Sequence, residues 1–266
     1  MKKFRYIGII AIALFSFYYT EKIASYTLEN NKIYQEIQNQ SSNYNISYVN
    51  AEVDGDYITP GLNGKTVSIK NSFYNMQELK TFNSYYLLYD TSYPEVSIEN
   101  NKDLIITKGN RLKNSVAFVL EYDQNIINYF KEKNIKSSIL VDLDTFDKKE
   151  TLEQINNEVV KYDNLESLIN KYSKNSNICY LNEVNESICR KNNKYLVKSN
   201  KEISNSTYLD VKNNIESGDI YLIKKNTNIK SINIIINSIL YKDLDIVYLS
   251  KLLSEERDWF KLSFLV

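Results

Sequence analysis

The chain of 266 residues contains no histidine, and this absence limits its chemistry more than any residue that is present. Without imidazole there is no Ser-His or Cys-His base, no common zinc ligand and no usual general acid at neutral pH. Any active site in this chain must therefore work without imidazole.

Glycine and net charge exclude further classes of function. The chain has only 6 glycines, and none lies between Gly109 and Gly218. A Walker loop and a dinucleotide-binding turn both need closely spaced glycines, so neither can lie in that stretch and we predict no cofactor. Lysine plus arginine and aspartate plus glutamate balance at 33 each. Without a basic surface, nucleic acid is not an expected partner.

The N-terminus resembles an export or anchoring segment. Three basic residues precede an uncharged run from Tyr6 to Thr20. This length suits either a cleaved signal peptide or a short anchor. The nearest small-residue site, Ile23-Ala24-Ser25, begins with a bulky residue and so favours an uncleaved signal anchor over residues 1–25. The leading basic residues predict a single-pass protein of the cell membrane with most of its chain extracytoplasmic.

Two short regions are expected to follow the anchor. Residues 26–50 indicate a short helix and a linker, and residues 51–110, which hold both prolines, predict a small β-rich module. Within the module we predict a hairpin of Val96 to Ile98 with Leu104 to Thr107. Four tyrosines of the module either stack on sugar rings or form a half-buried seam, which the general behaviour of tyrosine favours: Tyr85, Tyr86, Tyr89 and Tyr93.

Residues 111–266 predict an α/β domain. An apolar run from Val116 to Leu120, a helix with apolar residues Ile126, Ile127 and Phe130, and a second strand from Ser137 indicate parallel strands with a right-handed crossover. A helix is expected to present Leu152, Ile155, Val159 and Tyr162 after a capping pair of Asp147 and Glu150, and further turns or helices near 165–169, 183–190, 208–215, 228–241 and from 250. Parallel strands are predicted to start at Val116, Ser137, Asn177, Tyr195, Ile220 and Ile246.

Carboxylates follow the first two of these strands, where parallel sheets carry functional side chains. Glu121 and Asp123 follow the first strand and are the catalytic candidates, as an acid/base pair of the kind used in glycoside hydrolysis. Together with Asp142, Asp144 and Asp147 they offer oxygen ligands for Ca²⁺ or Mg²⁺. We favour the alternative that Asp144 and Asp147 cap the next helix while Asp142 faces solvent, so no metal ligand is assigned.

The stretch from Ser115 to Glu255 resembles the polysaccharide deacetylases, the NodB-homology group also called carbohydrate esterase family 4. SVAFVLEYD stands where the family has a strand ending in Phe-Asp-Asp-Gly, and SGDIYLIK is similar to its Gly-x-Ile-x-Leu-x-His strand. The resemblance implies a distorted (β/α) barrel. In active members of the family, a divalent metal held by one Asp and two His activates the water that removes acetyl groups from polysaccharides.

The residues that carry this chemistry are missing from the corresponding positions. The catalytic base corresponds to Glu121, the Asp ligand to Tyr122, the motif glycine to Asp123 and the late His to Lys224, while Leu181-Asn182 stands for an Arg-Pro motif. The resemblance therefore implies a degenerate member: a pseudoenzyme that binds cell-wall or surface polysaccharide or an envelope protein. Two alternatives stay open, an active hydrolase or deacetylase with a rearranged carboxylate site and a structural subunit of a membrane assembly.

The two cysteines, Cys179 and Cys189, are expected at the end of a strand and on the helix that follows it. This arrangement can bring their side chains together, and an extracytoplasmic location favours a disulfide. Two buried thiols are the alternative.

Overall fold

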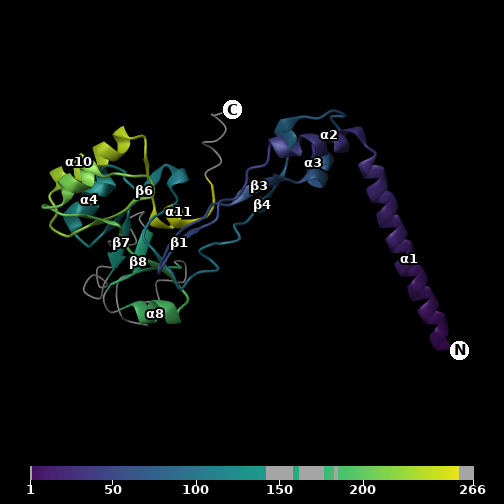
Figure 1. Ribbon diagram of the computed structural model, residues 1–266, viewed down its shortest axis with the longest axis horizontal. Coiled ribbons are helices and arrows are strands. Elements are labelled where there is room, and N and C mark those ends of the chain that lie inside the picture. Colours follow the sequence, from purple (N-terminus) through teal and green to yellow (C-terminus); the bar gives the residue numbers. More distant parts are fainter. Residues whose placement is uncertain (1, 142–157, 162–176, 183–184, 258–266) are drawn as a thin grey trace. The chain divides into compact units, whose positions relative to one another are not determined.

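The computed structural model describes residues 2–141, 158–161, 177–182 and 185–257 (Figure 1). The chain divides into two compact units, of which one comprises residues 1–47 with 64–92 and the other residues 48–63 with 93–266. The predicted module of residues 51–110 contributes to both. Residues 64–92 belong to the first unit, whereas the segments on either side supply strands to the main sheet of the second.

The first unit combines helices with a two-stranded sheet. Strands β3 and β4 pair antiparallel, with Gly64 opposite Ser92. The buried side chains of this unit, which include Ile37, Val67, Phe73 and Met76, pack in a small hydrophobic core. The elements are α1 (Lys2–Glu29), α2 (Lys32–Gln40), η1 (Ser41–Asn43), β3 (Gly64–Val67), α3 (Ile69–Met76), η2 (Ser84–Tyr86) and β4 (Tyr89–Ser92).

The prediction of a membrane anchor is wrong. Residues 2–29 form helix α1, yet within the described part of the chain no helix is both long enough and apolar enough to cross a membrane. The uncharged run, residues 6–20, is shorter than the roughly 20 apolar residues that a spanning helix needs. The predicted single-pass location at the cell membrane is therefore withdrawn.

The second unit is built on an 11-stranded sheet. Within the described residues, all its strand pairs are parallel except β1 with β2. The order is β1-β2-β5-β10-β9-β8-β7-β6-β12-β11, with β13 also paired to β6. The strands are β1 (Glu52–Asp54), β2 (Tyr57–Thr59), β5 (Ile105–Ile106), β6 (Ser115–Leu120), β7 (Ser138–Val141), β8 (Glu158–Lys161), β9 (Ile178–Tyr180), β10 (Tyr195–Val197), β11 (Lys201–Ile203), β12 (Ile220–Ile223) and β13 (Asp245–Val247).

The six parallel strands predicted from the sequence are confirmed as β6, β7, β9, β10, β12 and β13. Strand β6 has three partners, because β12 pairs with one of its sides while β13 and β7 share the other. The register of the first crossover places Val119 beside Ser138. The described strands form an open sheet, because β1 and β11 lie at the two ends of the strand order. The expected α/β fold is thus present, without a closed barrel in this part of the chain.

Helices cover both faces of the sheet because the side chains of β6 alternate between two cores. Phe118 and its neighbours on one face pack with Phe130 of α4 and Ile235 of α10. Val119 on the other face packs with Leu252 of α11. In Figure 1, α4 and α10 accordingly lie together on one side of β6. The helices in the described part of this unit are η3 (Arg111–Lys113), α4 (Gln124–Glu132), α8 (Glu186–Lys191), α9 (Tyr208–Asn213), α10 (Ile229–Tyr241) and α11 (Leu249–Leu253).

Two local predictions are wrong. The predicted hairpin does not form, because residues 98–100 make a turn and the following strand, β5, pairs in parallel with β2 and β10 instead. The helix expected through Val159 is strand β8 at that point, paired with β7. The adjacent β-branched pair Val159-Val160 suits a strand better than a helix. The rest of that helix, its capping pair and the turn near residue 167 lie outside the described residues.

Candidate functional site

Glu121 stands directly after the carboxyl end of β6, at the position predicted for a catalytic base. Its Oε1 atom accepts a hydrogen bond from Lys224 Nζ at 3.0 Å, and its Oε2 atom accepts one from the backbone N–H of Lys225, also at 3.0 Å. Only 18% of the Glu121 side chain is exposed. Both carboxylate oxygens are therefore bonded to the residues that follow β12.

The geometry follows from the parallel pairing of β6 with β12. Their register places Leu120 beside Ile223, so the next residues, Glu121 and Lys224, leave the sheet at the same edge. The Nζ atom of Lys224 also lies 3.7 Å from Oε2 of Glu202, a residue of β11, which pairs in parallel with β12. The cation is thus held between two carboxylates at the carboxyl edge of the sheet.

Asp123, the other catalytic candidate, serves as the N-cap of α4. Its Oδ1 atom accepts hydrogen bonds from the backbone N–H groups of Asn125 and Ile126, and its Oδ2 atom accepts one from the N–H of Asn226. A carboxylate at a helix N-terminus is stabilised by the unpaired N–H groups there. Asp123 and Glu121 are therefore brought to one edge of the sheet, where each carboxylate accepts at least one hydrogen bond from a backbone N–H group.

The residues present do not fit the metal centre that the resemblance implies. The resemblance sets Tyr122 at the Asp ligand; its hydroxyl donates to Gln124, and burial raises the pKa of this phenol, so it stays protonated and binds a cation poorly. The resemblance also sets the Lys224 ammonium at the position of a His ligand, and a fixed cation repels a metal ion. No group of three metal-ligating side chains occurs within the described ranges. Asp142, Asp144 and Asp147 lie outside those ranges.

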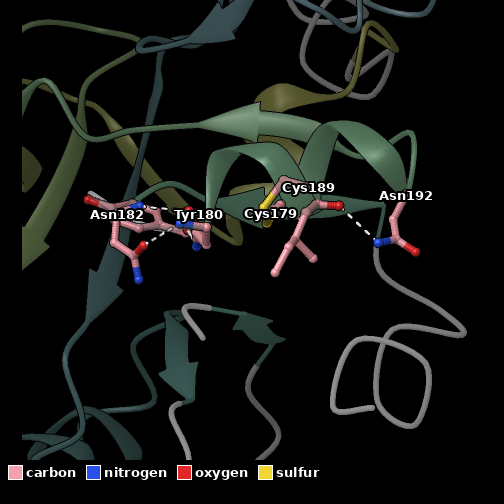
Figure 2. The surroundings of a disulfide bond; sticks show 7 residues. Cys179, Tyr180, Asn182, Cys189 and Asn192 are labelled. Atoms are coloured by element: carbon pink, nitrogen blue, oxygen red, sulfur yellow. Dashed lines mark hydrogen bonds between the residues drawn. A yellow bond between two sulfur atoms is a disulfide. The ribbon is translucent and has the colours of Figure 1, made fainter. Parts of the chain in front are cut away.

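Cys179 and Cys189 are joined by a disulfide between β9 and α8, with their Cα atoms 5.9 Å apart (Figure 2). Both side chains are buried in a small cluster with Leu181 and Leu196. Asn185, just before α8, donates from its side chain to the carbonyl oxygen of Tyr180. The bond and this amide together fix the helix against the strand.

Sequence reasoning missed a cavity of about 600 Å³ in the second unit. Asn177 and Tyr195 at the amino ends of β9 and β10 line it, as do Glu99 and Glu255 from segments far apart in the chain. Because strands β6 to β10 are parallel, this cavity and Glu121 lie at opposite edges of the sheet. Only the fold brings Glu99 and Glu255 together, and no spacing in the sequence indicates their proximity.

Comparison with known proteins gives a likeness of fold. No family model matches the chain. An uncharacterized protein of Bacillus subtilis (strain 168), YlxY, is 26% identical over 123 residues, which are 44% of this chain and 39% of YlxY. The chain thus matches well under half the length of that curated relative.

Two solved structures match most of both chains. BA3943 from Bacillus anthracis, a CE4 family pseudoenzyme, has a TM-score of 0.59 at 17% identity, covering 85% of this chain and 96% of that one. A BA3943 mutant with restored enzymatic activity has the same TM-score at 18% identity and covers 85% and 99%. The predicted resemblance to carbohydrate esterase family 4 is thereby confirmed at the level of the fold, and it includes a protein that is itself a pseudoenzyme.

Proposed function

We propose that this chain is a catalytically inactive protein of the polysaccharide-deacetylase fold that binds cell-wall or surface polysaccharide. The observation that carries the proposal is the ion pair of Glu121 with Lys224 at the carboxyl edge of the sheet. It places a fixed cation where the resemblance requires a metal ligand, and it occupies the carboxylate that corresponds to the catalytic base.

The loss of activity follows from what deacetylation requires. The water that attacks the acetyl group needs a lowered pKa, which a metal supplies, and the departing amine or alcohol needs a proton donor. The carboxylate of Glu121 already accepts two hydrogen bonds, so it is poorly placed to take a proton from water. The chain offers no histidine to replace the missing donor.

Binding of a polysaccharide is compatible with the side chains that this edge retains. Tyr122 donates to Gln124 Oε1, and Gln124 Nε2 donates to Asn128 Oδ1, so a row of a phenol and two amides runs onto the first turns of α4. Amides and phenols are the groups that pair with sugar hydroxyls, and an aromatic ring can also stack on a sugar. These three side chains can bind a sugar without a metal ion.

The test is sedimentation of the full chain with insoluble peptidoglycan and with chitin. The proposal predicts that the protein sediments with at least one of them and that Tyr122→Ala weakens sedimentation several-fold. Tyr241→Ala is the matched control, because Tyr241 ends α10 with 90% of its surface exposed. Sedimentation that both variants retain in full would place binding elsewhere, and the absence of sedimentation with either polymer would remove the proposal of polysaccharide binding.

A further inference from the structure

The cavity at the amino edge of the sheet has the size and the lining of a binding site for a small molecule. Its volume, about 600 Å³, falls within the range of roughly 300–1,000 Å³ that is usual for ligand pockets. Apolar side chains such as Ile178 and Leu253 form part of its wall, and polar groups from three separate segments converge on it. No catalytic candidate lines it.

Glu255 is one of the two carboxylates that line this cavity. Its Oε1 atom accepts hydrogen bonds from the backbone N–H groups of Gly61 and Ile98, at 3.0 and 3.1 Å. Its Oε2 atom accepts no hydrogen bond within the described part of the chain. Burial raises the pKa of this carboxyl group, since desolvation outweighs those two bonds and the attraction of Lys113. A cation brought next to Oε2 would relieve the cost of that partly buried charge.

Two residues that line the cavity, Glu99 and Tyr195, already contact one ammonium group, that of Lys102. The Nζ atom of Lys102 lies 2.5 Å from Glu99 Oε1 and 5.3 Å from the centroid of the Tyr195 ring, and the Tyr195 hydroxyl donates to Glu99. A carboxylate combined with an aromatic face is a well-established environment for an ammonium ion. Tyr93, 71% exposed, supplies a second aromatic ring on the wall. Glu255 also lines the cavity, and within the described part of the chain its carboxylate accepts hydrogen bonds from backbone N–H groups and not from a lysine.

We propose that this cavity binds a small polar molecule that carries a primary ammonium group, with Glu255 Oε2 as its acceptor and the rings of Tyr93 and Tyr195 beside it. Amino sugars and free polyamines share this chemistry. The proposal does not depend on polysaccharide binding at the Glu121 edge, because the two sites lie at opposite edges of the sheet.

Isothermal titration calorimetry with the full chain at neutral pH tests the proposal. Four probes are compared: glucosamine, 1,4-diaminobutane, N-acetylglucosamine and glucose. We expect at least one of the two amines to bind and both neutral sugars to bind at least tenfold more weakly. Binding of glucosamine alone assigns the site to amino sugars, and binding of 1,4-diaminobutane assigns it to free amines. Equal binding of glucosamine and N-acetylglucosamine, or heat from neither amine, overturns the proposal.

Single substitutions test whether the amine binds in this cavity. Glu255→Gln should weaken binding of the amine at least tenfold, whereas Glu256→Gln, at the exposed neighbouring residue, should leave it unchanged. Tyr93→Ala tests the site without touching a buried group and should weaken binding several-fold. Among the described residues, the charged and titratable groups that interact electrostatically with Glu255 are Lys113, Glu99 and Tyr195. Affinity should fall as the pH is lowered through the raised pKa of Glu255, and equal affinity of the wild-type chain and Glu255→Gln would contradict the assignment.

Discussion

Breaking the Cys179–Cys189 bond should destabilise the second unit by an amount that depends on the length of the loop that the disulfide closes. The two cysteines are separated by 10 positions. A loop of that length loses about 9 cal/mol/K of entropy when it is closed in the unfolded chain, which is about 2.7 kcal/mol at 25 °C. Because Cys179 and Cys189 are 3% and 0% exposed, replacing both with alanine would add the cost of a small cavity. Reduction of the bond therefore gives the cleaner measurement.

Urea unfolding followed by circular dichroism, with and without a reductant, measures this difference. With a denaturant slope of roughly 3 kcal/mol/M, the loss corresponds to a midpoint lower by about 0.9 M. The Cys179→Ala/Cys189→Ala variant is the control and should unfold at one midpoint under both conditions. A wild-type midpoint that the reductant leaves unchanged, or two reactive thiols per chain in unreduced protein, would refute the reasoning.

Three further outcomes are expected. Glu121→Gln should lower the free energy of unfolding by about 1–2 kcal/mol, and a double-mutant cycle with Lys224→Met should show coupling; additive effects would contradict the ion pair. Gly218→Ala should lower the free energy of unfolding by more than about 2 kcal/mol. At this position φ is +90°, and the added Cβ would lie 2.4 Å from a backbone carbonyl oxygen. Gly55→Ala, at φ +57° with open space around it, should cost less, and equal losses would argue against the clash. The raised pKa of Glu255 means that the folded chain binds this proton more tightly than the unfolded chain does. Stability relative to Glu255→Gln should therefore increase as the pH falls through that pKa, and urea midpoints that show the opposite trend would be inconsistent with its burial.

The predicted strands were recoverable from the sequence because buried parallel strands are short apolar runs between polar turns. Val116 to Leu120 and Ile220 to Ile223 are of this kind, and every residue in both runs is buried. The strand at Glu158 to Lys161 was predicted as helix because it has only two apolar residues, and one of them, Val159, continues the helical spacing of Leu152 and Ile155. Pairing with β7 decides its conformation, and that contact is not visible in the sequence.

The candidate site was only partly predictable. The strand pattern placed Glu121 and Asp123 at the end of β6, and the family resemblance, not the pattern, drew attention to Lys224 after β12. Their bonding was not predictable, because it depends on the one-residue register that places Leu120 beside Ile223. The cavity around Glu255 was not predictable for a stronger reason. Its carboxylate is bound by Gly61 and Ile98, which are separated from it by well over a hundred residues.

The measurement that tests the central proposal most directly is acetate release by the full chain in the presence of Zn²⁺, Co²⁺ or Ni²⁺. The substrates are chitooligosaccharides, acetylated xylan and peptidoglycan. The ion pair of Glu121 with Lys224 predicts release equal to background, also in Tyr122→Asp, because restoring one carboxylate leaves the site without a histidine ligand and with a fixed cation. Acetate release that rises with protein concentration and disappears in Glu121→Gln would contradict it and would identify a working hydrolase.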